Sequence, residues 1–249
     1  MSEVLTFEPG GYRYLKGVFQ YSAGVGAMDG FVIERARFRK ALPLADGMAA
    51  IERHLKKIGR PSHALCACEL RSPAPFTEAE FTDFNRLYVR DLERMGLLAK
   101  GENPVARTNV CPERYPPPGP AVYAFSYTVV EGAAAPSFIG AGSGEAREGA
   151  GSYSAVTIRP GDTSPEGLRE KARWVLGEME RRMGAFGLGW SQITATSLYT
   201  VHDIHPFLAS ELAERGAIEH ALSWFFARPP VKGLDYEMDV RAVARELVV

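Results

Sequence analysis

The sequence is short of cysteine, of net charge and of long apolar runs, and each shortage excludes a class of protein. Its three cysteines are too few, and odd in number, for a disulfide framework, which favours free thiols in a reducing compartment. No apolar run approaches the ~20 residues that a membrane-spanning helix needs. The opening residues, MSEVLTFEPGG, have neither the cationic start nor the apolar segment of a secretory signal. We therefore predict a cytoplasmic protein without a membrane partner.

The charges nearly cancel, with 29 lysines and arginines against 30 acidic residues. Domains that bind nucleic acid usually have a basic face or an isoelectric point above about 9, so we expect no nucleic-acid partner. The chain is well supplied with apolar residues, which make up 46% of its 249 positions. That is enough core for one large domain or two small ones.

The first half alternates strand-like segments with two amphipathic helices. Runs of β-branched and aromatic residues predict strands at 12–25, 31–38, 63–70, around Arg107 and at 121–130. Apolar residues recur at helical spacing in two segments, with stripes formed by Met48, Ile51, Leu55 and Ile58 and by Phe81, Phe84, Tyr88 and Leu92 or Met95. Thr77 and Glu80 have the spacing of a capping box, which places the start of the second helix.

The second half repeats this order. Strands are expected at 137–144, 152–160, 192–201, 220–229 and 234–244. Helices are expected at 164–184, where Ser164 is the cap and Pro165 the first helical residue, and at 203–216. We interpret the chain as an internal duplication, with one repeat at residues 1–130, a linker at 131–136 and a second repeat at 137–249.

Several short motifs carry a family resemblance. They are SAG (22–24), DFNRLY (83–88), PVARTNV (104–110), TSLYTVHDI (196–204) and YEMDVRAVA (236–244). The order of these motifs resembles that of the RidA superfamily, also called YjgF or endoribonuclease L-PSP. The resemblance occurs in both halves of the chain and covers roughly residues 10–130 and 137–246. The resemblance implies an α+β fold of two RidA-like (chorismate mutase-like) repeats, each a mixed β-sheet covered on one face by two helices.

The resemblance also implies an activity. Family members hydrolyse reactive imines, enamines or related deamination substrates without a cofactor. A family arginine binds the substrate carboxylate, and a glutamate near the C-terminus helps to position water. On this chain those roles fall on Arg107 and Glu237. A planar, permanently charged guanidinium suits a carboxylate because it offers two charge-assisted hydrogen bonds.

Further site residues follow from the same resemblance and from strand alternation. Asp239 lies on the same face of its expected strand as Glu237. The segment GGYRY (10–14) resembles a family turn that places a tyrosine, here Tyr12 or Tyr14, near the ligand. We count Tyr14 among the expected catalytic residues. The expected substrate-binding residues besides Arg107 are Asn85, Tyr12, Gly24, Ser143 and His220, with Ser143 lying in a glycine-rich segment that could present N–H groups to an anion.

Each half departs from the family pattern. The strand at 121–130 has no acidic residue where the second half has Glu237 and Asp239. The second-half position that matches Arg107 is Ala221, beside His220. Asn109 stands where the family has a cysteine. Two interpretations are open: Arg107 and Glu237 from different repeats share one cleft, or Arg107 anchors a ligand while the rest of the chemistry has changed.

Other functions also remain open. The chain could act as a chorismatase-like or ring-amide hydrolase on another carboxylate substrate, or as a non-catalytic carboxylate-binding protein. A structural alternative pairs Arg107 with Glu113 or Glu102, and another places Glu237 and Asp239 on the solvent face of an edge strand. His202 and His205 have a three-residue spacing that could bind a metal, but the sequence shows no third ligand to join them. We therefore expect a role at the start of a helix and no metal.

The family typically forms trimers of single units, with ligand sites between neighbours. For this chain the resemblance implies a homo-oligomer, and we expect three two-repeat chains. The expected small-molecule partner is a carboxylate substrate.

Overall fold

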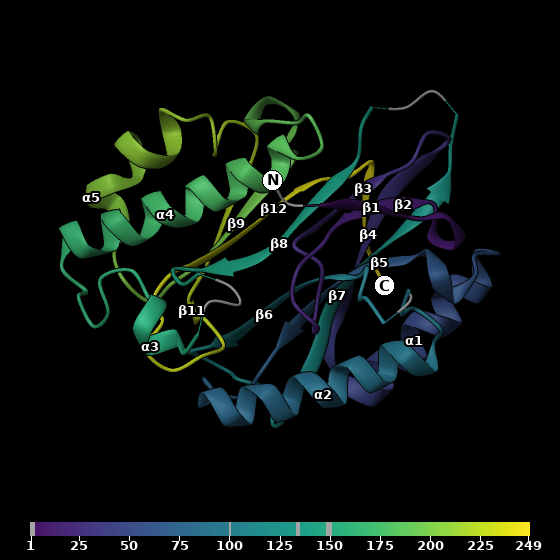
Figure 1. Cartoon of the computed structure of the whole chain (residues 1–249), viewed down its shortest axis with the longest axis horizontal. Coiled ribbons are helices and arrows are strands. Elements are labelled where there is room, and N and C mark those ends of the chain that lie inside the picture. The colour runs from purple at the N-terminus through teal and green to yellow at the C-terminus, as the bar shows by residue number, and fades with distance from the viewer. Residues whose placement is uncertain (1–2, 100, 133–134, 148–150) are drawn as a thin grey trace.

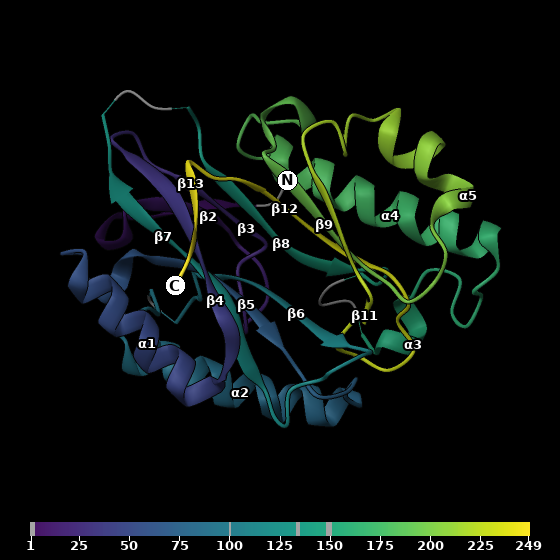
Figure 2. The same ribbon diagram turned by 180° about the vertical axis from the view of Figure 1, so that it is seen from behind.

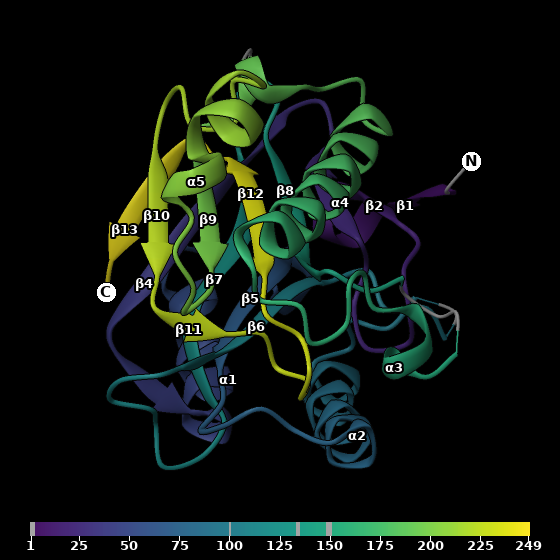
Figure 3. The same ribbon diagram turned by 90° about the vertical axis from the view of Figure 1, so that its left-hand side faces the viewer.

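The computed structural model describes residues 3–99, 101–132, 135–147 and 151–249. Helices α1 (Leu44–Lys57) and α2 (Glu78–Arg94) lie on one side of the molecule, and α4 (Pro165–Gly184) and α5 (His205–Phe207) on the other (Figure 1). Two β-sheets fill the space between these helix pairs (Figure 3). None of the helices in the described part of the chain is both long and apolar enough to cross a membrane.

Within the described ranges, the first sheet has six strands and the second has seven. In spatial order the first contains β11 (Ala227–Arg228), β6 (Ala106–Pro112), β5 (Leu65–Arg71), β7 (Ala121–Val130), β4 (Phe31–Pro43) and β13 (Arg245–Val248). The second contains β1 (Val4–Phe7), β2 (Tyr12–Leu15), β3 (Gly24–Ala27), β8 (Phe138–Gly144), β12 (Glu237–Ala242), β9 (Ala195–Tyr199) and β10 (Leu222–Phe225).

The same four-strand arrangement occurs in both sheets. In the first sheet β4 pairs antiparallel with β7, β7 antiparallel with β5, and β5 parallel with β6. In the second sheet β8, β12, β9 and β10 pair in the same order and with the same directions. The predicted α+β class with two mixed sheets is confirmed.

The two halves of the chain also exchange edge strands. The hairpin of β2 and β3, from the first half, joins the second sheet by pairing β3 with β8. In return, β11 and β13 from the second half extend the first sheet, and β13 runs parallel to β4 (Figure 2). The division at 130 and 137 stays a prediction, and residues 133–134 of the expected linker lie outside the described residues. The trimer also stays a prediction.

Most predicted elements form, and several details differ. The segment 203–216, expected as one helix, contains the three-residue α5 followed by a π-helix at Leu208–Ala213, and β13 was not predicted from the sequence. The segment 152–160 is not a strand: it contains the short helix α3 (Tyr153–Val156). The physical reason is that β3 already occupies the edge of β8 on which a second-half strand would have paired. Ile58, expected in the apolar stripe of α1, lies just past the end of the helix and is 40% exposed.

Helix α2 begins as the capping box predicts, and it positions part of the site described below. The Thr77 hydroxyl accepts a hydrogen bond from the Glu80 backbone N–H, and the Glu80 carboxylate accepts one from the Thr77 backbone N–H. The buried face of the helix contains Phe81, Phe84, Asn85, Tyr88 and Leu92.

Replacing Thr77 by alanine should lower the free energy of unfolding by about 1 kcal/mol, because the first turn loses a side-chain acceptor. Denaturant unfolding measures the change. Thr82→Ala is the matched control, since the Thr82 hydroxyl bonds to the helical carbonyl of Glu78 and caps nothing. Equal losses in the two variants would contradict a capping role.

Candidate active site

Arg107 is buried near the start of β6 and is held mainly by aromatic rings. Its side chain is inside the molecule, with the residue only 3% exposed. The guanidinium carbon lies 5.0–5.9 Å from four ring centroids, those of Tyr21, Phe81, Phe84 and Tyr88. Such contacts stabilise a cation through the negative face of each ring. The ring cluster therefore keeps the charge inside the protein and fixes its direction.

The hydrogen bonding of Arg107 leaves capacity for a ligand. Nη1 donates to Oδ1 of Asn85 on α2 at 2.5 Å, while Nε has no hydrogen-bond partner. Within the described residues Arg107 forms no ion pair. The structural alternative is wrong, because Glu113 pairs with Arg228 and Glu102 pairs with Lys16. A buried guanidinium without a carboxylate is suited to accept one from a substrate.

Glu237, from the other half of the chain, faces the same cavity as Arg107. It begins β12, a strand with β8 on one side and β9 on the other, and is 3% exposed. The idea that Glu237 and Asp239 form the solvent face of an edge strand is therefore wrong. The carboxylate lies directly over Gly142 of β8, in the space that a Cβ atom there would occupy. Glycine at 142 makes the burial of this acid possible.

The two residues line one cavity between the sheets. About 420 Å³ of the space that these residues line is not filled by protein atoms, and this volume includes open solvent at the mouth. Its walls are Tyr21, Phe81, Arg107, Asn109, Gly142, Gly144, Ala146, Tyr153, Pro230, Val231, Leu234 and Glu237. These residues come from both halves of the sequence. The first of the two open interpretations thus has the geometry it needs, because the arginine and the acid reach a common space.

Burial controls the protonation of the acid. Loss of hydration raises the pKa of Glu237 well above its ordinary value, and the nearby Asp239 carboxylate raises it further. The positive charge of Arg107 acts in the opposite direction but is outweighed. Glu237 can therefore hold a proton where an exposed glutamate would have lost it, which suits a general acid.

Asp239 lies beside this cavity rather than in its wall. Its Oδ2 accepts hydrogen bonds from the Thr108 hydroxyl at 2.8 Å and the Tyr199 hydroxyl at 2.7 Å. It lines a second, smaller space that also touches Arg107. Burial raises the pKa of Asp239, and the charge of Glu69 adds to the effect. The structure thus links β12 to β6 through Asp239 and Thr108.

The other predicted site residues lie in different surroundings. Asn85 contacts Arg107 directly, as described. Tyr12 and Tyr14 are buried in the core of the first half, where the Tyr12 hydroxyl donates to the backbone oxygen of Leu65. Gly24 pairs with Gly140 inside the second sheet. Ser143 is buried, with its hydroxyl 3.4 Å from the Gly144 carbonyl oxygen, and His220 is exposed before β10. None of these six residues is in the wall of the cavity.

Sequence reasoning missed several wall residues. Tyr21 supplies the aromatic ring nearest to Arg107, in place of the tyrosines expected from GGYRY. Its position directly before the SAG motif was the available signal. Gly142 could be recognised only once its contact with Glu237 was known. Asn109 lies in the wall at the position where the family has a cysteine, and the sequence alone assigns it no role.

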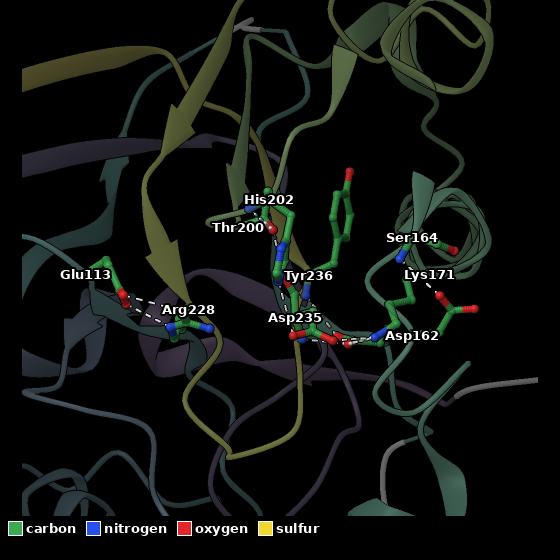
Figure 4. Close-up of polar contacts among 10 residues, drawn as sticks. Glu113, Asp162, Ser164, Lys171, Thr200, His202, Arg228, Asp235 and Tyr236 are labelled. Carbon is green, nitrogen blue, oxygen red and sulfur yellow. Dashed lines mark hydrogen bonds and ion pairs between the residues drawn. The ribbon is translucent and has the colours of Figure 1, made fainter. Parts of the chain in front are cut away.

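A buried charge cluster holds the backbone that leads into Glu237. Lys171, fully buried on α4, donates to Asp235 Oδ2 at 2.5 Å and lies 3.4 Å from Glu145 Oε1. The Glu145 carboxylate accepts hydrogen bonds from the backbone N–H groups of Asp235 and Tyr236, at 2.6 and 3.1 Å. Figure 4 shows the Asp235 side chain between Lys171 and His202. These contacts fix the two residues immediately before Glu237.

The histidines of the 202–205 segment have partners of their own. His202 Nε2 lies 3.3 Å from Asp235 Oδ1, and His205 Nδ1 lies 2.6 Å from Asp203 Oδ1. Across the described ranges, no group of three or more histidine, cysteine or acidic side chains could hold a metal ion. The expectation of a metal-free site is an inference from the sequence that these contacts do not test.

Comparison with known proteins identifies the family. The family model described as 2-aminomuconate deaminase CnbZ matches residues 4–247. The chain belongs to this family. A curated relative, 2-amino-5-chloromuconate deaminase from Comamonas testosteroni, is 52% identical to this chain over 251 residues. The alignment covers 100% of both chains. The activity class that the motifs imply, a deaminase of imines or enamines, agrees with the description of this family.

Two solved structures from E. coli are also similar to the chain. The YjgF gene product matches with a TM-score of 0.32 and 23% identity, over 44% of this chain and 81% of that one. TdcF with bound serine matches with a TM-score of 0.32 and 20% identity, over 43% of this chain and 80% of that one.

Replacing Lys171 by methionine should lower the free energy of unfolding by about 3–5 kcal/mol, because two carboxylates would be left buried without their cation. Denaturant unfolding at neutral pH measures the loss. Lys56→Met, at an exposed position of α1, is the matched control and should change stability little. If Lys171→Met lowers the free energy of unfolding no more than the control does, the charge cluster does not stabilise the backbone before Glu237.

Glu237→Gln should stabilise the protein increasingly as the pH rises. An unfolded glutamate ionises near pH ~4.3, whereas the raised pKa keeps the native Glu237 protonated to higher pH. The native state then binds more protons than the unfolded state, so the wild-type stability falls as the pH rises through this window. Unfolding titrations of both proteins from about pH 4 upward test this.

The matched control is Glu219→Gln, at an exposed position. A difference between Glu237→Gln and wild type that does not change with pH would refute the raised pKa.

Proposed function

We propose that this protein is a cofactor-independent deaminase of a small, carboxylate-bearing enamine of the aminomuconate type. The observation that carries the proposal is that Arg107 and Glu237, from different halves of the chain, line one cavity. The family match and the relative named 2-amino-5-chloromuconate deaminase support the same chemistry. In this proposal the substrate carboxylate next to the amine binds to Arg107.

The proposed reaction begins with a proton transfer. Protonated Glu237 donates its proton to a carbon of the enamine system, the carbon–carbon double bond shifts, and the amine becomes an iminium group. The raised pKa of Glu237 supports this role, because the carboxyl group retains a proton to donate. Arg107 orients the substrate by two hydrogen bonds to its carboxylate, so that the reacting carbon lies near the acid.

Water completes the reaction. The Glu237 carboxylate accepts a proton from a water molecule as the water oxygen bonds to the iminium carbon. The resulting carbinolamine loses ammonia and becomes a ketone. One water molecule is consumed and one ammonia released, with no net oxidation or reduction. Imines and enamines already react with water, so orientation and proton transfer are sufficient assistance.

Ammonia release from freshly generated 2-aminomuconate tests the proposal. Glu237→Gln should lower kcat by about 10²–10⁴-fold, the usual contribution of a general acid or base. Arg107→Ala should raise KM strongly, and Arg107→Lys should recover only part of the loss because lysine cannot form the paired hydrogen bonds. Wild-type activity should fall as the pH rises through the raised pKa of Glu237, since the protonated form is required.

Glu219→Gln, an exposed substitution of the same kind, should leave kcat and KM unchanged. Wild-type protein that releases no ammonia above the buffer rate would overturn the proposed function. Activity retained in Glu237→Gln would remove that residue from the mechanism.

A further inference from the structure

Asn109 presents an unused hydrogen-bond donor in the cavity wall. The residue is 2% exposed and lines the same space as Arg107 and Glu237. Its Nδ2 is buried and has no hydrogen-bond partner. Buried polar groups are nearly always satisfied, and an unsatisfied one is destabilising. A partner for Nδ2 is therefore expected from whatever occupies the cavity.

The orientation of the amide is fixed from the neighbouring strand. The buried Ser72 hydroxyl, just past the end of β5, donates to Asn109 Oδ1 at 3.0 Å. The Ser72 backbone N–H in turn donates to the Val110 carbonyl oxygen at 2.9 Å, which holds Ser72 against β6. With Oδ1 engaged, the free part of the amide is its N–H donor. The group that binds there must be an acceptor, which a carboxylate is and a protonated amine is not.

The place of Asn109 relative to Arg107 suggests which acceptor it meets. The two residues are two apart on β6, so their side chains leave the same face of the strand about 6.6 Å apart along it. An extended six-carbon diacid separates its two carboxylates by a comparable length. The cavity wall also includes Pro230, Val231 and Leu234, which are apolar and suit a conjugated carbon chain.

We propose that Asn109 is a specificity-determining residue whose Nδ2 donates a hydrogen bond to the second carboxylate of a dicarboxylate substrate. Arg107 holds the carboxylate next to the amine, and Asn109 recognises the distal one. The inference rests on the proposed function in that it concerns the substrate of the same site. It adds the residue that distinguishes a linear conjugated diacid from a monoacid of equal length.

Two unreactive ligands test this selection without turnover. Muconate in its all-trans form has the six-carbon conjugated chain with two carboxylates, and sorbate has the same chain with a methyl group in place of one carboxylate. Calorimetric titration gives the dissociation constant of each. Wild-type protein should bind muconate more tightly than sorbate. Asn109→Leu, of similar size, should reduce that preference about 10-fold or more, because a hydrogen bond to a charged group is lost.

Sorbate binding serves as the internal control for folding. In Asn109→Leu it should stay near the wild-type value, because the Arg107 contact is intact. Asn109→Asp should weaken muconate binding further through repulsion between two carboxylates, again with sorbate little changed. Ser72→Ala, which frees the amide to turn, should reduce the preference less than Asn109→Leu does, and it provides a second test if the Asn109 variants do not fold.

Three results would overturn the proposal: equal binding of muconate and sorbate by wild type, an unchanged preference in Asn109→Leu, or equal weakening of both ligands in that variant. Failure of the proposed function is a separate result. Wild type that prefers muconate but releases no ammonia from 2-aminomuconate keeps the role of Asn109 in diacid binding and rejects the deaminase. Wild type that releases ammonia but binds muconate and sorbate equally keeps the deaminase and rejects the role of Asn109.

Discussion

A guanidinium buried without a carboxylate needs another source of stabilisation, and the site is built around the way Arg107 obtains it. Four aromatic rings and the Asn85 amide surround the charge, so that it is tolerated inside the protein with hydrogen-bonding capacity unused. Three of those rings and Asn85 belong to α2, and the fourth belongs to Tyr21, directly before the hairpin strand that joins the second sheet. The arrangement of α2 against β6 therefore sets the position of the cation.

The acid opposite it depends on a different set of contacts. Glu237 is buried because Gly142 leaves room for its carboxylate on β8. The backbone before it is fixed by Glu145, Lys171 and Asp235, a cluster formed entirely within the second half. Lost hydration then raises the pKa of Glu237, so that this carboxyl group can retain a proton. Each half thus supports one charged group, and the cavity lies where the two meet.

Exchange of edge strands explains how two halves with similar plans produce one cavity. The pairing of β3 with β8 places Tyr21 and the SAG motif next to the second sheet. The hydrogen bond from Thr108 to Asp239 links β6 to β12 across the two sheets. A site divided in this way explains why neither half contains all the residues that the family resemblance implies. Arg107 and Glu237 can each be absent from one half because a single cavity needs each of them once.

Local pattern was enough to predict most elements from the sequence. The Thr77–Glu80 cap, the stripes of α1 and α2, the Ser164 start of α4 and the limits of β7 all depend on neighbouring residues. The motifs around Arg107 and Glu237 are local in the same way. Tertiary structure decided which side chains meet. Residues 152–160 do not form a strand because β3 occupies the edge of β8. Glu237 is buried because β12 is an inner strand of its sheet. The free amide of Asn109 depended on Ser72, 37 positions earlier. Such contacts join residues far apart in the chain, and no local periodicity records them.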